Sequence, residues 1–414
     1  MAVIRPFRAL RPRTELADKV AALPYDVYSR SEAREKVKGD GYSFLRIDRP
    51  ETQFEPDCDM YAPEIYQKAD EMLRQMEAEG VFVQDERACY YIYELVMDGR
   101  SQTGLVACSA VDDYISGVIK KHENTRREKE EDRVRHVDVC SAQTGPIFLA
   151  YRGNEKIRKI LKEEKRREPE TAFMAEDGVW HRVWVIEDTA HVSALTKAFA
   201  DLQHTYIADG HHRAASAVRV SLKRREEHPD FTGQEEFNYF LSVLFADEEL
   251  MIMDYNRVLK ELNGYQPEEI LKKLEEVCEV EAVGENAYRP EKKGEMGFYM
   301  KGSWYRLSAR KERCQEDPVG ALDVAFLQRE ILEPFFGIQD PKTDGRIDFV
   351  GGIRGLQELE RRCGADCICA FSMYPTSIGE LFNVADADLL MPPKSTWFEP
   401  KLRSGLFIHK IERI

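Results

Sequence analysis

Short apolar segments alternate with charged stretches through the middle third of the chain. An apolar run at 147–151 precedes a charged helical stretch, and an alternating run at 179–186 precedes a helical stretch from Val192. A further apolar run at 205–208 ends at Asp209 and passes at once into an alanine-rich helical stretch. Strands and helices that interleave in this way pack as layers of sheet and helix. The sequence therefore predicts a mixed α/β or α+β fold.

The length of 414 residues exceeds what one core usually serves, because domains are typically about 100–200 residues long. We expect at least two lobes, and changes of pattern suggest an N-terminal lobe at 1–115, a central lobe at 116–260 and a C-terminal lobe at 261–414. The segments 237–245 and 249–253 are expected to form a hairpin. Loops between such elements are expected to carry the unusual motifs.

The net charge of −15 limits the possible partners. Nucleic-acid-binding proteins usually present a basic patch to phosphates, whereas the basic runs at 162–167 and 223–227 are interleaved with acids. We therefore expect no nucleic-acid partner.

The chain has no run of about 18 apolar residues and no secretory pattern at its start, and its nine cysteines are mostly scattered. We expect reduced thiols, no membrane partner and a cytoplasmic location.

The turn after 205–208 carries the densest set of polar residues, Asp209-Gly-His-His-Arg. We expect Asp209 at the helix N-cap and Gly210 where the backbone passes close to another group. Backbone N–H groups at a helix N-terminus are unpaired, and the helix dipole adds partial positive charge, so such a turn attracts phosphate. His211, His212 and Arg213 add donors, and arginine can bind a phosphate through two parallel hydrogen bonds.

The two adjacent histidines do not suit a shared metal ion. Successive residues of a helix diverge by about 100°, whereas a chelating pair needs a spacing of three or four. One alternative is structural, with Asp209 capping the helix while His211 and His212 satisfy local hydrogen bonds. The density of the motif favours a functional site.

A second motif lies at 120–128. Thr125 and Glu128 have the spacing of a capping box, which predicts a helix after Thr125. His122, Glu123 and Asn124 would then lie in the turn before that helix, where Glu123 could serve as a magnesium ligand or general base. A charged loop in which only the cap matters explains the pattern equally well.

A third motif near the C-terminus runs from Met391 to Leu406. Two prolines stiffen its start, and hydroxyl and cationic side chains follow within a dozen residues. This mixture favours phosphate recognition, although the Walker loop pattern is absent; the alternative is a tail that packs over the core. The candidate residues are Lys394, Ser395, Thr396, Lys401 and Arg403.

A fourth stretch, near the N-terminus, combines Pro24-Tyr-Asp-Val with Ser43-Phe-Leu-Arg. Asp26 and Arg46 are candidates for a substrate pocket, and a structural role is equally compatible with the pattern.

These four stretches together resemble a widespread bacterial and archaeal family known as domain of unknown function 1015. The resemblance extends over essentially the whole chain, through Pro24-Tyr-Asp-Val, Ser43-Phe-Leu-Arg, His122-Glu-Asn-Thr, Asp209-Gly-His-His-Arg and Met391-Pro-Pro-Lys-Ser-Thr. The family implies no particular activity.

A more distant resemblance is to the ParB and sulfiredoxin superfamily, which includes free-serine kinases. Asp209-Gly-His-His-Arg is similar to its phosphate-contacting motif, and Glu123-Asn-Thr-Arg-Arg is similar to the box with which ParB-like proteins hold a nucleotide and magnesium. The two motifs occur here in the reverse of the ParB order, and no cysteine occupies the position of the sulfiredoxin nucleophile. The resemblance implies a ParB-like nucleotide site in one lobe.

The main hypothesis is a magnesium-dependent phosphotransferase that uses ATP or ADP to phosphorylate a small hydroxylated metabolite, with L-serine as the named candidate. Asp209 or Glu123 would bind Mg²⁺ or accept the hydroxyl proton. The alternatives are a nucleotide-binding switch or partition-like module without turnover, and a phosphohydrolase. The residues expected to bind the nucleotide and its phosphates are Gly210, His211, His212, Arg213, His122, Asn124, Thr125, Lys394, Ser395 and Thr396.

Overall fold

A computed structural model describes residues 1–412 and divides the chain into two compact units. Unit 1 comprises Met1–Leu250 together with the chain from Pro400, whose described part, 400–412, is called the C-terminal segment below. Unit 2 comprises Met251–Glu399. Within residues 1–412, no helix combines the length and apolar character needed to cross a bilayer. The fold is mixed α and β, as the alternating pattern predicts.

Unit 1 is built on one nine-stranded sheet in the order β6-β11-β8-β12-β5-β4-β10-β9, with β1 also paired to β5. Most neighbours are antiparallel, while β12 runs parallel to β8 and β11 parallel to β6. Strands of both the expected N-terminal and central ranges therefore share this sheet. The strands are β1 (Ile4–Arg5), β4 (Tyr90–Met97), β5 (Arg100–Ala110), β6 (Ile119–Lys120), β8 (Ile147–Tyr151), β9 (Thr171–Met174), β10 (Trp180–Ile186), β11 (Thr205–Asp209) and β12 (Tyr239–Ala246).

Helices α5 (Val111–Ile115), α7 (Glu155–Glu164), α8 (Thr189–Ala200) and α9 (His211–Glu227) accompany this sheet. The apolar stripes of α7, α8 and α9 join the sheet in one core, which contains Leu161, Phe199 and Val218. Burial of these stripes against the strands is what holds the helices in place. The start of α9 is thereby fixed beside the end of β11.

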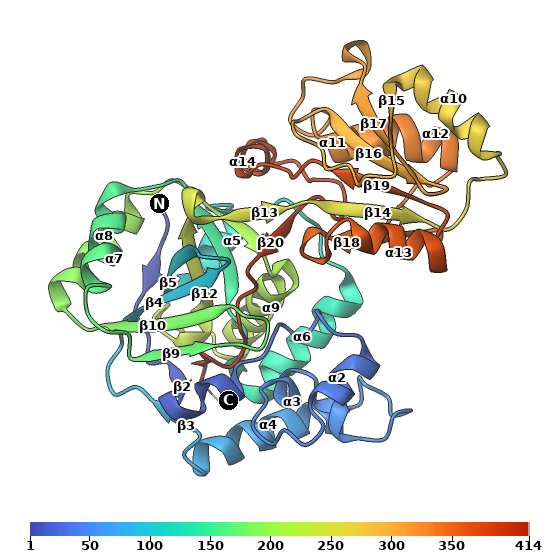
Figure 1. The fold of residues 1–414 in the computed structure, drawn as a ribbon. Helices are drawn as coiled ribbons and strands as arrows, with labels where there is room; N and C mark the ends of the chain where they lie inside the picture. The colour runs from blue at the N-terminus through green and yellow to red at the C-terminus, as the bar shows by residue number, and fades with distance from the viewer. Residues whose placement is uncertain (413–414) are drawn as a thin grey trace. The chain divides into compact units, whose positions relative to one another are not determined.

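A second core of unit 1 lies among α1 (Ala17–Val20), α2 (Arg30–Lys36), α3 (Leu45–Asp48), α4 (Pro63–Ala78) and α6 (Arg127–Cys140). Figure 1 shows α2, α3, α4 and α6 gathered together, away from α7 and α8. Ile408 of the C-terminal segment is fully buried in this core. Two short sheets complete unit 1, formed by β2 (Leu10–Pro12) with β3 (Phe82–Gln84) and by β7 (Ala142–Gln143) with β21 (His409–Lys410).

Unit 2 contains a six-stranded sheet in the order β15-β17-β16-β19-β14-β18 and the two-stranded pair β13-β20. The strands are β13 (Met251–Met253), β14 (Tyr255–Leu259), β15 (Cys278–Gly284), β16 (Glu295–Met300), β17 (Ser303–Ala309), β18 (Ile347–Gly351), β19 (Cys369–Met373) and β20 (Trp397–Glu399). The helices are α10 (Pro267–Val277), α11 (Asp323–Phe326), α12 (Glu333–Phe336), α13 (Gln357–Ala365) and α14 (Ile378–Asp386), with a π-helix at Leu327–Leu332.

The expected hairpin of 237–245 with 249–253 is wrong. Strand β12 pairs with β5 and β8 in unit 1, whereas β13 pairs with β20. Both segments are apolar enough to be strands, but the short turn at 247–249 separates two units instead of reversing the chain within one sheet. A hairpin pattern specifies two strands and a turn, and the partner strand is decided by packing.

The C-terminal segment fits into unit 1 with little spare room, which gives a stability prediction. A Cβ on Gly405, whose φ is +84°, would lie 2.5 Å from the Phe44 side chain. We expect Gly405→Ala to lower the free energy of unfolding by about 2–4 kcal/mol, because steric overlap adds to backbone strain. Urea unfolding measures this change. Gly99→Ala is the matched control, because Gly99 has φ +78° with no atom within 4 Å of its Cβ position and should cost only about 1 kcal/mol.

Candidate functional site

The turn between β11 and α9 is the centre of the candidate site. Asp209 is the last residue of β11, and Gly210 is the N-cap of α9 with φ +92°. The expected N-cap at Asp209 is therefore wrong by one residue, because the chain needs a left-handed residue to turn from strand into helix. Gly210 provides no side-chain cap to this 17-residue helix, and the first-turn N–H groups of a helix have no partner within the helix.

The Asp209 carboxylate is held on both oxygens. Its Oδ1 accepts a hydrogen bond from the Gly210 N–H at 2.8 Å, and its Oδ2 lies 3.1 Å from the Lys401 Nζ. Burial alone would raise the pKa of Asp209, but the charges of Lys401 and Arg213 outweigh it and hold that pKa well below its usual range. Asp209 therefore stays ionised and orients the ammonium group of Lys401.

The C-terminal segment brings Lys401 to this turn from 192 positions further along the chain. Backbone bridges fix the segment, since Ser404 pairs with Ala22 and Ile408 pairs with Leu10. The position of Lys401 therefore depends on the packing of unit 1 around the end of the chain.

Arg213 points from the first turn of α9 toward the loop before β8. Its Nη1 donates a 2.6 Å hydrogen bond to the Pro146 carbonyl. A cavity of about 30 Å³, lined among others by Arg213, Arg133, Thr144 and Ser404, lies beside it and has room for about one water molecule. The guanidinium is thus held next to a small cavity.

His122 and His211 meet behind the turn. Their ring centroids lie 4.5 Å apart with the planes at 89°, and both side chains are buried. Burial lowers the pKa of His122 to about 4, and burial together with the neighbouring His122 lowers that of His211. His122 hydrogen-bonds to the backbone of Ile207, while its Nδ1 and the Nε2 of His211 have no hydrogen-bond partner within the described chain. Two buried neutral imidazole nitrogens are therefore left without a hydrogen-bond partner within residues 1–412.

His212 links the two histidine motifs. Its Nε2 accepts a 2.9 Å hydrogen bond from the backbone N–H of Arg126. The expected capping box at Thr125 is wrong, because α6 begins at Arg127 with Arg126 as N-cap. The Thr125 hydroxyl instead donates to Glu130 at 2.6 Å, two residues beyond the Glu128 that the capping pattern required.

Glu123 and Asn124 lie in the same connection, between β6 and α6, with Glu123 half-buried and Asn124 exposed. Magnesium does not fit Asp209 as it is arranged, because both of its oxygens are engaged and two cations lie nearby. Across residues 1–412, no group of three or more His, Cys, Asp and Glu side chains is placed to hold a metal.

The other sequence candidates in unit 1 lie apart from this turn or at its rim. Arg403 is buried, where its Nε contacts the His181 Nε2 at 3.3 Å and its guanidinium pairs with Asp177. Arg46 donates to the Gln53 side chain at 3.2 Å. Asp26 is exposed at the mouth of a second cavity, which is described below.

Lys394, Ser395 and Thr396 belong to unit 2. The Lys394 ammonium lies 5.6 Å from the Tyr255 ring centroid, and the Ser395 hydroxyl donates to the Pro392 carbonyl at 2.6 Å. Their role in nucleotide binding stays a prediction.

Comparison with known proteins identifies the family. Residues 4–325 match the family described as "Protein of unknown function (DUF1015)". The chain belongs to this family. A search of curated proteins found no match to it.

Several solved structures resemble this DUF1015 protein at low identity. A free serine kinase variant in complex with ADP is 13% identical, with 75% of this chain and 92% of that chain covered and a TM-score of 0.37. SbnI with a C-terminal truncation, from Staphylococcus aureus, is 10% identical, with coverages of 71% and 82% and a TM-score of 0.38. A conserved hypothetical protein from Pyrococcus furiosus is 14% identical, with coverages of 75% and 95% and a TM-score of 0.33. Likenesses at these TM-scores carry no argument about the activity of this DUF1015 protein.

Sequence reasoning missed Tyr25 and Arg133 in the DUF1015 protein, although both line the cavity beside Arg213. Arg133 lies in the middle of a charged helix, where a solvated position is the ordinary expectation, yet it is buried with its guanidinium 4.2 Å from the Tyr25 ring centroid. The Pro24-Tyr-Asp motif, which contains Tyr25, was the only available signal for this contact.

The buried state of His122 predicts a pH dependence. Its pKa is lowered to about 4, below the ordinary value of about 6.5, so protons bind preferentially to the unfolded chain. The free energy of unfolding should therefore fall as the pH drops from about 6.5 toward 4. Urea unfolding at pH 7 and at pH 4.5 measures this effect. We expect the free energy of unfolding to fall between these pH values by about 2–3 kcal/mol less in His122→Gln than in the wild type.

His228→Gln is the control for this prediction, because His228 is exposed and its variant should follow the wild type. Equal losses in His122→Gln and the wild type would show that His122 is not buried in the neutral form.

Proposed function

We propose that this DUF1015 protein is a nucleotide-dependent phosphotransferase that acts on a small hydroxylated metabolite and holds phosphate at the N-terminus of α9. The observation that carries the proposal is the open first turn of α9, capped by Gly210, with the cations Arg213 and Lys401 beside it. Preorganised N–H groups and cations are what phosphoryl transfer requires, because the reaction depends mainly on positioning and on neutralising charge.

Two buried imidazole nitrogens support the same site. The His122 Nδ1 and the His211 Nε2 lack hydrogen-bond partners within the described chain, and leaving such groups unsatisfied costs about 1–3 kcal/mol each. A phosphate or an acceptor hydroxyl would satisfy them.

The proposed reaction moves one phosphoryl group from the nucleotide to the acceptor oxygen. The acceptor O–H bond and the bond from phosphorus to the nucleotide oxygen break, a bond from phosphorus to the acceptor oxygen forms, and the acceptor proton passes to a base. We assign that base to Glu123 in preference to Asp209, because the lowered pKa of Asp209 makes it a weak proton acceptor. Asp209 instead orients Lys401.

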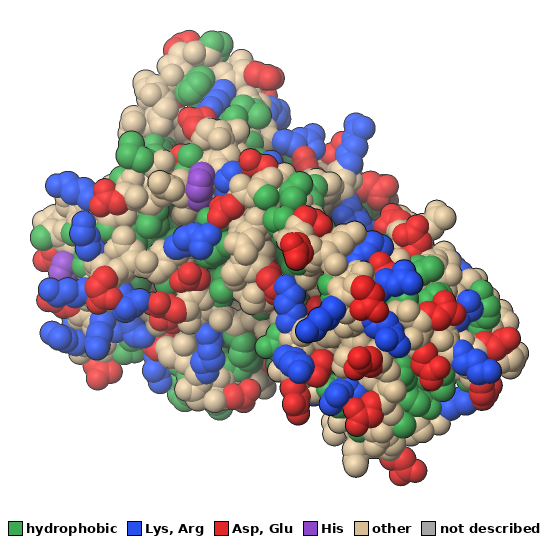
Figure 2. Space-filling model, turned by 90° about the horizontal axis from the view of Figure 1, so that it is seen from above, with side chains coloured by type: hydrophobic (Ala, Val, Ile, Leu, Met, Phe, Trp, Pro, Cys, Tyr) green, Lys and Arg blue, Asp and Glu red, His purple; other side chains and the backbone are tan. Residues whose placement is uncertain are grey.

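A nucleotide-binding switch without turnover is the second candidate, and it would bind nucleotide at the same turn. A DNA-partition role fits the charge poorly, because the net charge is −15 and acidic and basic side chains are interspersed on the face seen in Figure 2. A phosphohydrolase would use the same groups with water as the acceptor.

Mass spectrometry of an incubation tests the proposal. The protein is mixed with ATP or ADP, with magnesium chloride as the counter-ion of the nucleotide, and with L-serine, other hydroxyamino acids and polyols. We expect a phosphorylated acceptor in the wild type and at least about a hundredfold less in Asp209→Ala, because Lys401 loses its partner. Asp230→Ala, at an exposed position, should match the wild type. Product formation by Asp209→Ala at the wild-type rate contradicts the proposal, and phosphate release without an acceptor product assigns the hydrolase.

Nucleotide affinity gives a separate test that needs no turnover. We expect Lys401→Gln to weaken ADP binding about tenfold in isothermal titration calorimetry, because one cation near the phosphates is lost. Lys159→Gln removes an exposed lysine of α7 and should leave the affinity unchanged. Unchanged ADP affinity in Lys401→Gln would show that the phosphates of the nucleotide do not bind at this turn.

A further inference from the structure

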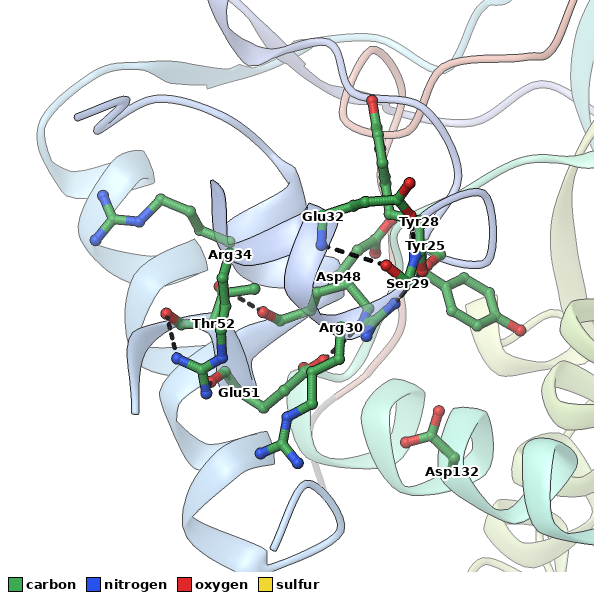
Figure 3. A network of polar contacts seen from close by, with 12 residues as sticks. Tyr25, Tyr28, Ser29, Arg30, Glu32, Arg34, Asp48, Glu51, Thr52 and Asp132 are labelled. Carbon is green, nitrogen blue, oxygen red and sulfur yellow. Dashed lines mark hydrogen bonds and ion pairs between the residues drawn. The ribbon is translucent and has the colours of Figure 1, made fainter. Parts of the chain in front are cut away.

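Unit 1 contains a second, larger cavity that the proposed phosphate site does not use. Its volume is about 190 Å³, close to that of six water molecules. Four of its lining residues are tyrosines, so it is called the tyrosine pocket: Tyr25, Tyr28, Tyr61 and Tyr66. Figure 3 shows Tyr25, Glu51 and Asp132 around this region, carried by three different segments of the chain.

The interior of the tyrosine pocket is built from buried ion pairs. The Arg49 Nε lies 2.6 Å from the Glu51 Oε1, and the Arg133 Nη2 lies 2.8 Å from an Asp132 oxygen. The Tyr66 hydroxyl donates to Asp132 at 2.9 Å. Each arginine is therefore neutralised within the wall, and the interior carries no net charge from these pairs.

The turn that bears Glu51 is fixed from behind. Arg34 of α2 donates to the carbonyls of Glu51 at 2.7 Å and Phe54 at 2.6 Å, as part of the network in Figure 3. Arg49 donates to the carbonyls of Tyr25 and Tyr28, both at 2.9 Å. These bonds make the pocket wall a preformed surface, which is typical of a ligand site.

The rim of the tyrosine pocket carries one charge of each sign. Asp26 and Lys129 line the cavity and are exposed, and neither has an ion pair or side-chain hydrogen bond within residues 1–412. Both lie beside His212. Burial lowers the pKa of His212, Lys129 lowers it further, and Asp26 raises it. The rim therefore offers a carboxylate and an ammonium group to a ligand.

We propose that the tyrosine pocket binds a small zwitterionic amino compound with an apolar or aromatic body. Asp26 would receive the ligand's ammonium group, Lys129 its carboxylate, and the tyrosines its body, because tyrosine faces pack against rings and attract cations. The balance of charges selects a zwitterion over an organic cation or anion. The volume and the aromatic lining favour a ligand with a larger body than the hydroxymethyl group of serine.

Isothermal titration of the full chain without nucleotide tests this proposal independently of the proposed phosphotransfer. The probes are L-phenylalanine, phenethylamine, 3-phenylpropionate and L-serine, which separate the two charges and the body. We expect L-phenylalanine to bind at least about tenfold more tightly than each of the others, since each lacks one of the three contacts. Equal binding of phenethylamine would identify an organic-cation site and overturn the proposal, as would the absence of binding by all four probes.

Variants at the rim give the sharper result. Asp26→Asn should weaken L-phenylalanine and phenethylamine and leave 3-phenylpropionate unchanged, whereas Lys129→Gln should weaken L-phenylalanine and 3-phenylpropionate and leave phenethylamine unchanged. Tyr61→Ala, at an exposed lining position, should weaken all three aromatic probes. Asp230→Asn and Lys159→Gln are matched controls outside the lining. If these controls lose as much probe affinity as the rim variants, the effects come from overall charge.

Discussion

The contact between Asp209 and Lys401 is the interaction on which the candidate site depends. It joins the end of a sheet strand to the C-terminal segment at 3.1 Å, and both side chains are partly buried. A partly buried ion pair is costly to break from one side, because the remaining charge keeps its desolvation penalty without its partner. The pair therefore holds the carboxylate ionised and keeps the ammonium group beside the open turn of α9.

The C-terminal segment that carries Lys401 is anchored by the residues that follow it. Arg403, two residues after Lys401, lies among Tyr93, His181 and Asp177, and its backbone N–H reaches the Tyr93 hydroxyl at 3.4 Å. The Tyr93 hydroxyl in turn meets the His181 Nδ1 at 2.7 Å. Burial, together with the nearby Arg403 charge, lowers the pKa of His181 to about 3, so the imidazole is neutral there. Arg403 is thus a positioning residue for the segment, although its sequence context favoured contact with substrate.

The local sequence predicted the parts of the site that depend on interactions between residues close together in the chain. Strand β11, the glycine turn and helix α9 follow from apolar alternation, the need for positive φ and helix propensity. The N-caps of α9 and α6 each lie one residue after the expected position, since several polar residues near each helix start could serve. The pairing of β13 with β20 and the contact of Lys401 with Asp209 join residues more than 140 positions apart. Such contacts leave no local pattern, because packing alone selects between equally apolar or equally charged partners.

The α9 turn and the tyrosine pocket differ in the charges that they present to a ligand. At the α9 turn, the cations Lys401 and Arg213 outnumber the single carboxylate of Asp209, so the local field favours an anion even though the whole chain carries −15. In the tyrosine pocket, Arg49 and Arg133 are each matched by an acid, so the interior gains nothing from binding an anion. Tyr25 lines both cavities, and Arg133 stacks on its ring. Arg133 also lines both cavities, so the stacked pair of Tyr25 and Arg133 is a shared part of their walls.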